Sequence, residues 1–405
     1  PSPWSEGNML MQIGLKGYEI EPADRPPINL TLLIDVSGSM GAQNKLPLAK
    51  KALKLLVDQM GEKDTISIAV YAGAAGSVLE PTKGTDKTAI LEALEKLNAG
   101  GSTAGGEGLR LAYEMAEKNF NKDGVNRVMI LTDGDFNVGV TQDEQLEDFV
   151  SRKRASGVFL SVMGFGEGNY NDKMMQKIAQ AGNGMAAYVD TLNEARKLLS
   201  DDLSGSLFTI AKDVKIQVEF NPYRVSEYRL IGYETRMLDE ADFKNDKVDA
   251  GEIGAGHSVT AIYEITPKGS DSGMIDEKRY NSNKTSDVDR HKVTEWAFVK
   301  LRYKQPDSDT SKEVSIPVTN GSVYKKIEDA PQYARFAAAV AGYGQLLKGS
   351  PFIQNDFSYD EVVKLAQTAR GEDEFGYRAE FVQLVRAAKT ADAQEKLDDG
   401  LPKDE

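Results

Sequence analysis

Oxygen-bearing side chains stand at the ends of two short apolar runs. Asp35, Ser37 and Ser39 occupy alternate positions directly after the first run. Asp133 follows the second run, in the sequence Thr-Asp-Gly-Asp. Carboxylate and hydroxyl oxygens are hard ligands, which Mg²⁺ and Mn²⁺ prefer. These residue types therefore predict a divalent metal site.

A glycine-rich stretch, residues 100–106, adds Thr103 to this set. Glycines permit tight turns and a close approach of the backbone to an ion. Ser37, Ser39 and Thr103 would ligate the metal through neutral hydroxyls, while Asp35 and Asp133 would neutralise it directly or through water. Such a set leaves an octahedral Mg²⁺ short of one anionic ligand. We therefore expect the metal to attract a carboxylate from outside the chain.

Residues needed for other chemistries are scarce. The chain has no cysteine and only two histidines, which excludes thiol catalysis, zinc–thiolate sites and disulfides. Phosphatases on similar sheets often place a second aspartate two residues after the first, but Ser37 stands at that position. The three motifs contain no lysine to hold a phosphate, and no Gly-x-Ser-x-Gly elbow surrounds Ser37 or Ser39.

Length and composition set the class of protein. With 405 residues we expect two or three domains, and a hydrophobic fraction of 40% is ordinary for a folded protein. The formal net charge of -14 argues against nucleic acid or an anionic membrane surface as the main partner. No apolar run reaches the roughly 18–20 residues of a membrane span, so none is expected in this chain.

The elements that would position the motifs alternate between strand and helix. Apolar runs at 30–34, 65–71, 127–131, 158–163 and 185–189 read as strands, with helical spacing between them. This rhythm is typical of right-handed βαβ units. We expect an α/β fold, a Rossmann-like, doubly wound and mostly parallel sheet. The motifs would meet at its switch point, where such sheets bind ligands.

After about residue 203 the pattern changes to a period of two. Alternation at 214–220, 259–266, 293–303 and 314–318 predicts an antiparallel β-sandwich, and the chain turns helical from residue 329. A strand pattern at 9–15 has no natural partner in the α/β domain, so we expect it to join the sandwich. The expected organisation is an N-terminal strand region (1–27), an α/β domain (28–203), a β-sandwich (204–328) and a C-terminal helical segment (329–405).

Two further acidic features have alternative interpretations. Asp135 is either an additional helper of the metal site or part of a solvated turn. The acidic loop 239–249 resembles a calcium loop in composition, but its spacing misses the EF-hand pattern, which favours a solvated loop.

The three motifs resemble the metal-ion-dependent adhesion site (MIDAS) of von Willebrand factor type A (VWA) domains. Asp35, Ser37 and Ser39 match its first segment, Thr103 its second and Asp133 its third, so all five positions are filled. Residues 211–222 and 252–265 resemble the C-terminal region of a bacterial subfamily of exported VWA proteins. These are often labelled calcium-activated chloride channel homologues, a label that we disregard because no span supports a channel.

The resemblance implies a bound Mg²⁺, or alternatively Mn²⁺ or Ca²⁺, and an unknown protein partner that presents an Asp or Glu to it. It also implies the cell envelope, either periplasmic or surface-anchored as a lipoprotein, with a cytoplasmic location as the alternative. The chain opens at Pro1 without a methionine, and we expect that a leader or lipid anchor has been removed.

The sequence therefore favours a non-enzymatic, metal-dependent protein-binding module for adhesion or scaffolding. A metal-dependent, phosphatase-like hydrolase is the alternative. Envelope assembly through the β and helical regions is a third possibility, compatible with the first.

Overall fold

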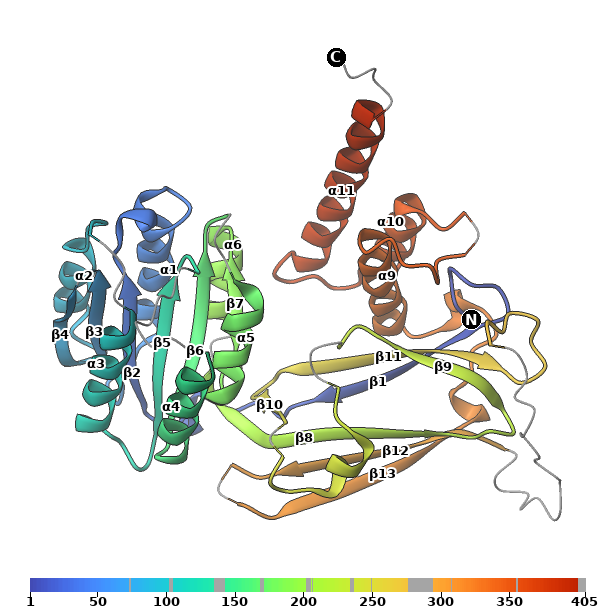
Figure 1. Ribbon diagram of the computed structural model, residues 1–405, viewed down its shortest axis with the longest axis horizontal. Coiled ribbons are helices and arrows are strands. Elements are labelled where there is room, and N and C mark those ends of the chain that lie inside the picture. The colour runs from blue at the N-terminus through green and yellow to red at the C-terminus, as the bar shows by residue number, and fades with distance from the viewer. Residues whose placement is uncertain are drawn as a thin grey trace.

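The computed structural model describes most of the chain, namely residues 1–72, 74–101, 105–134, 143–167, 171–201, 205, 207–233, 237–248, 250–275, 294–306, 308–354 and 356–399. Figure 1 shows an α/β domain beside a β region, which carries a group of helices. The α/β fold with a mostly parallel sheet, the added antiparallel sheets and the C-terminal helices agree with the sequence prediction.

A sheet of six strands in the order β4-β3-β2-β5-β6-β7 forms the centre of the α/β domain. Its strands are β2 (Ile28–Asp35), β3 (Thr65–Ala72), β4 (Ala74–Lys83), β5 (Val125–Thr132), β6 (Val158–Phe165) and β7 (Ala186–Val189). Only the β3–β4 pair is antiparallel. β4 was not predicted from the sequence, because its half-exposed residues show no clean alternation and Pro81 interrupts them.

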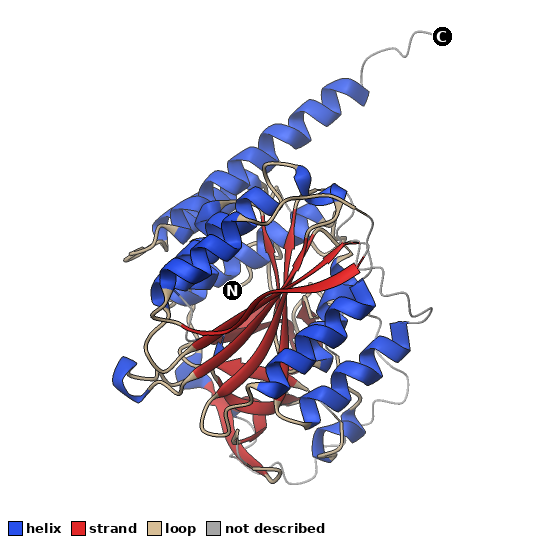
Figure 2. Ribbon diagram, turned by 90° about the vertical axis from the view of Figure 1, so that its left-hand side faces the viewer, coloured by secondary structure: helices blue, strands red, loops and turns tan. Residues whose placement is uncertain are grey.

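Helices cover both faces of this sheet, as the turned view in Figure 2 shows. They are α1 (Leu46–Gln59), α2 (Lys87–Glu95), α3 (Gly105–Lys118), α4 (Asp143–Ala155), α5 (Asp172–Ala181) and α6 (Leu192–Arg196). One apolar core joins β2 to α1 and α2, and a second joins β3 and β5 to α3, α4 and α5. Every residue of β2 is buried, which explains its unbroken apolar run.

Two antiparallel sheets form the β region. The first has the order β1-β11-β9 and the second β10-β8-β12-β13. The strands are β1 (Met9–Lys16), β8 (Thr209–Phe220), β9 (Val225–Ile231), β10 (Gly251–Gly254), β11 (Ser258–Pro267), β12 (Glu295–Lys304) and β13 (Ser311–Thr319). β1 pairs with β11 from Met9 to Lys16, so the N-terminal strand joins the β region across the intervening α/β domain. Apolar side chains from both sheets share one core.

Three helices follow the second sheet: α9 (Gln332–Leu347), α10 (Tyr359–Thr368) and α11 (Tyr377–Asp399). A buried polar network attaches α9 to the first sheet. Arg229 of β9 donates to Glu264 of β11 at 2.8 Å and to Gln345 of α9 at 2.5 Å. Trp4, fully buried, packs edge-on against Phe357, which joins the N-terminal segment to the same helices. Within the described residues, no helix is long and apolar enough to cross a membrane.

Candidate metal centre

Strand pairing brings the first and third motifs together. β2 lies between β3 and β5, and Ile34 is in register with Leu131. Asp35 and Asp133 therefore lie at or just beyond the carboxyl ends of two neighbouring central strands. Both aspartates are buried, with 0% and 1% of their surface exposed. Burying two carboxylates side by side is unfavourable unless cations or hydrogen bonds compensate their charge.

Local hydrogen bonds hold the first motif around Asp35. The backbone N–H of Ser37 donates to Asp35 Oδ1 at 2.8 Å, and the Thr132 hydroxyl donates to Oδ2 at 3.3 Å. The hydroxyl oxygens of Ser37 and Ser39 lie 3.0 Å apart, with Ser37 buried and Ser39 exposed. Burial raises the pKa of Asp35 above its ordinary value, and the charge of Asp133 adds to this effect.

The glycine-rich stretch is fastened to the first motif through its backbone. Gly38 N–H donates to the carbonyl of Gly101 at 3.1 Å, and Gly100 N–H donates to the carbonyl of Val36 at 2.7 Å. Gly101 has a φ of +87°, a conformation that favours glycine. Thr103 and Asp135 lie outside the described residues, so the positions predicted for them stay predictions.

One oxygen of Asp133 is engaged and the other is not. Lys45 Nζ donates to Oδ2 at 2.8 Å. Oδ1 is buried and has no hydrogen-bond partner in the described part of the chain. A buried acceptor without a partner is unfavourable, and a metal ion or its bound water would satisfy it. With the carboxylate of Asp35 and the hydroxyls of Ser37 and Ser39, the donor set suits Mg²⁺.

The structure adds three residues that the sequence analysis did not select. Thr132 orients Asp35, Tyr71 of β3 lies beside it, and Lys45 contacts Asp133. Burial and the charge of Asp35 raise the pKa of Tyr71 well above its ordinary value, so its hydroxyl keeps its proton. Thr132 lies within the Thr-Asp-Gly motif and was the easiest of the three to find. Lys45 lies six residues beyond Ser39, and no motif or periodic pattern in the sequence marks it as part of the site.

Other metal centres are not supported where the structure can be described. No three His, Cys, Asp or Glu side chains gather there as a metal-binding group. In the acidic loop, Lys215 Nζ donates to the carbonyls of Asp242 and Asn245 at 3.2 and 2.6 Å. Lys304 Nζ donates to the carbonyl of Asp246 at 2.9 Å. Ammonium groups thus occupy carbonyls that a calcium ion would need. Most of the described residues of this loop are exposed, which agrees with the solvated loop favoured by the sequence.

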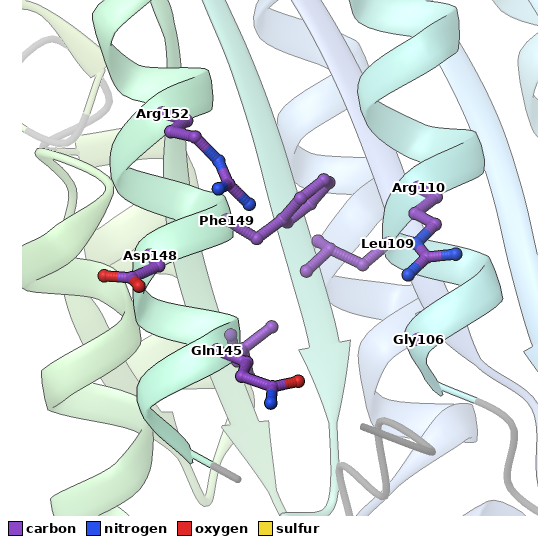
Figure 3. Close-up of a pocket in the computed structure, with 8 residues that line it drawn as sticks. Gly106, Leu109, Arg110, Gln145, Asp148, Phe149 and Arg152 are labelled. Atoms are coloured by element: carbon purple, nitrogen blue, oxygen red, sulfur yellow. The ribbon is translucent and has the colours of Figure 1, made fainter. Parts of the chain in front are cut away.

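A groove lies between α3 and α4, and Gly106, the last residue of the glycine-rich stretch, lines one end of it (Figure 3). It has a volume of about 270 Å³. Leu109, Leu146 and Phe149 supply its apolar lining. Arg110 and Arg152, both exposed, stand on opposite sides of it, and no ion pair to either is found among the described residues. We refer to it as the α3–α4 groove.

Two known protein families match this chain, one over the α/β domain and the other over the β region and helices. The model of the von Willebrand factor type A domain family matches residues 29–201, and the family described as "Uncharacterized protein YfbK, C-terminal" matches residues 205–391. The second match covers the β strands from β8 onward and most of the helical segment.

Similar proteins come from several bacteria. Protein YfbK of Escherichia coli (strain K12) is 45% identical over 389 residues, which are 96% of this chain and 66% of that protein. Protein sll0103 of Synechocystis sp. is 35% identical over 48% of this chain and 44% of its own length. Among solved structures, a von Willebrand factor type A protein from Catenulispora acidiphila aligns over 95% of this chain and 91% of its own, with 15% identity and a TM-score of 0.47. The chain is thus shorter than the curated relatives that it matches. It contains a VWA domain followed by a YfbK-type C-terminal domain, and it is homologous to YfbK.

Proposed function

We propose that this chain is a non-enzymatic protein-binding module that captures an acidic side chain of a partner at a divalent metal. VWA domains are typically protein-interaction modules. The proposed ion is Mg²⁺, held by Asp35, Ser37, Ser39 and Asp133, with Thr103 as a further ligand. When bound, the metal supplies a Lewis-acidic position for an external carboxylate.

The observation that carries the proposal is the buried Oδ1 of Asp133, which has no hydrogen-bond partner among the residues that the structure describes. This oxygen lies at the carboxyl ends of β2 and β5, where Asp35 and the two serine hydroxyls also lie. Two carboxylates and three hydroxyls fill five positions of an octahedral ion, so one position stays open for a partner's carboxylate. His257, the histidine that the structure describes, lies between β10 and β11, away from these residues.

The α3–α4 groove fits the same class of partner. Its apolar floor would bury an aliphatic or aromatic side chain, and Arg110 and Arg152 would pair with carboxylates. We propose that the groove receives the part of an acidic partner segment next to the residue held by the metal. Asp148 also lines the groove, so its charged lining residues, two arginines and one aspartate, sum to +1, the sign that attracts an acidic segment.

Water relaxation of the Mn²⁺-loaded chain tests this function, because a carboxylate that enters the metal's shell displaces bound water. A peptide with a central Glu should lower the relaxation rate of water protons, and the matched Gln peptide should not. Asp35→Ala should abolish the effect. Equal effects of the two peptides, or an unchanged response in Asp35→Ala, would refute carboxylate capture.

A metal-dependent hydrolase is the second candidate, and Lys45 is the observation that favours it. This lysine places an ammonium group at the metal centre, where phosphatases use a cation to hold phosphate. Ser37 still stands where a second catalytic aspartate is common. Turnover of a generic phosphoester that disappears in Asp35→Ala would support this candidate over the first.

A further inference from the structure

We propose that Lys45 is a fixed positive charge that shares Asp133 with the metal, weakening metal binding and strengthening capture of the partner's carboxylate. The proposal rests on the metal-dependent function above. Lys45 is not one of the proposed ligands and lies outside all three motifs.

The contact between Lys45 and Asp133 is largely shielded from solvent. Nζ lies 2.8 Å from Oδ2, and the side chains are 12% and 0% exposed. Surface lysines form weak, solvent-screened pairs, whereas buried charges interact strongly. The ammonium uses only Oδ2, which leaves Oδ1 for the metal. The carboxylate can therefore serve both cations at the same time.

The alkyl chain of Lys45 lies against the backbone of Gly166. A Cβ atom on Gly166 would lie 2.3 Å from Cε and 2.6 Å from Cγ of Lys45, so the absent side chain makes the space for this lysine. Gly166 follows β6, and its carbonyl accepts a hydrogen bond from the Tyr188 hydroxyl at 2.7 Å. A flexible lysine normally loses considerable rotamer entropy when it is ordered. Here the packing of the chain already orders it.

The local charges give the expected consequence. Asp35 and Asp133 carry two negative charges, which a divalent ion alone would cancel. Lys45 adds one positive charge, so the metal-loaded centre has an excess of one positive charge. The ammonium repels the metal and draws electron density from Asp133, which weakens metal binding. The same excess attracts one external carboxylate, which restores neutrality.

Lys45→Met tests the proposal, with Lys51→Met as the matched control. Lys51 is an exposed lysine of α1, and its substitution removes the same charge away from the metal centre. Titration with Mn²⁺ alone gives the metal affinity, and the Glu peptide added to the Mn²⁺-loaded chain gives the carboxylate affinity. We expect Lys45→Met to bind Mn²⁺ about tenfold more tightly and the Glu peptide about tenfold more weakly. Lys51→Met should leave both affinities near wild type.

The opposite signs distinguish this role from structural damage. Loss of both affinities in Lys45→Met would show that the lysine only supports the fold, and unchanged affinities would show that its charge has no effect; either result overturns the proposal. Lys45→Gln retains a hydrogen-bond donor without the charge and should behave like Lys45→Met.

A third measurement uses the unmodified chain. Amine-reactive labelling followed by peptide mass spectrometry should show Lys45 protected relative to Lys51, both with and without Mn²⁺. Labelling of Lys45 that rises to the level of Lys51 on metal addition would show displacement instead of sharing. If wild type binds Mn²⁺ but not the Glu peptide, the proposed function fails, while the metal affinity of Lys45→Met still tests the repulsion.

Discussion

Replacing Gly108 by alanine should destabilise the α/β domain, although glycine-to-alanine changes within helices usually stabilise. Gly108 lies in the second turn of α3, which begins just after the glycine-rich stretch. A Cβ atom there would lie 2.7 Å from Cβ of Tyr71 and 3.2 Å from Cδ1 of Leu33. These neighbours belong to β3 and to β2, the strand that ends at Asp35.

The magnitude follows from two opposing effects. Alanine gains about 1 kcal/mol over glycine in a helix interior. Forcing a methyl group into a filled core costs typically 1–3 kcal/mol, and a contact of 2.7 Å to a strand-anchored Cβ belongs at the upper end. We expect Gly108→Ala to lose about 1–2 kcal/mol, or roughly 2–8 °C in melting temperature.

Gly344→Ala in α9 is the control, because nothing lies within 4 Å of its added Cβ. It should gain about 0.5–1 kcal/mol. Hydrogen exchange measured on peptides from α3 and α9 assigns each change to its own helix, with faster exchange in α3 for Gly108→Ala and slower exchange in α9 for Gly344→Ala. Slower exchange in α3 of Gly108→Ala would refute the close packing of α3 on β3.

Three further predictions concern other parts of the molecule. Glu264→Gln leaves the partly buried Arg229 without its ion pair and should cost about 1–3 kcal/mol, seen as faster proteolysis between the β region and α9; unchanged proteolysis would contradict this. Charge reversal of both Arg110 and Arg152 should weaken Glu-peptide binding about tenfold while Mn²⁺ affinity stays within twofold, roughly, of wild type, and equal peptide affinity would exclude the groove. Millimolar Ca²⁺ should not raise the melting temperature of Asp35→Ala, since lysines occupy the carbonyls of the acidic loop; a rise would reveal a separate calcium site.

The sequence predicted the fold best where burial is uniform. β2 and β5 are buried on both faces, and their apolar runs also placed Asp35 and Asp133 at neighbouring strand ends. The strands β4, β9 and β10 were not predicted, because each is short or half-exposed. Such strands form through pairing with their neighbours in the sheet, which the local sequence pattern does not reveal.

The candidate site could be predicted only as far as its motifs extend. Asp35, Ser37, Ser39 and Asp133 were selected by residue type and position at strand ends. Lys45 was not, because its role depends on the path of its side chain over Gly166, more than a hundred residues away in the sequence. The lysines that donate to carbonyls of the acidic loop were not predicted for the same reason. Such contacts between distant residues leave no periodic trace.

The central claim is that Asp35 belongs to a single divalent metal site. Calorimetric titration of the full chain with Mg²⁺ and Mn²⁺, in wild type and Asp35→Ala, tests it most directly. We predict one site per chain in wild type and an affinity at least about a hundredfold lower in Asp35→Ala, since the variant loses a buried anionic ligand. No metal binding by the wild-type chain, or equal binding by the two proteins, would contradict the claim.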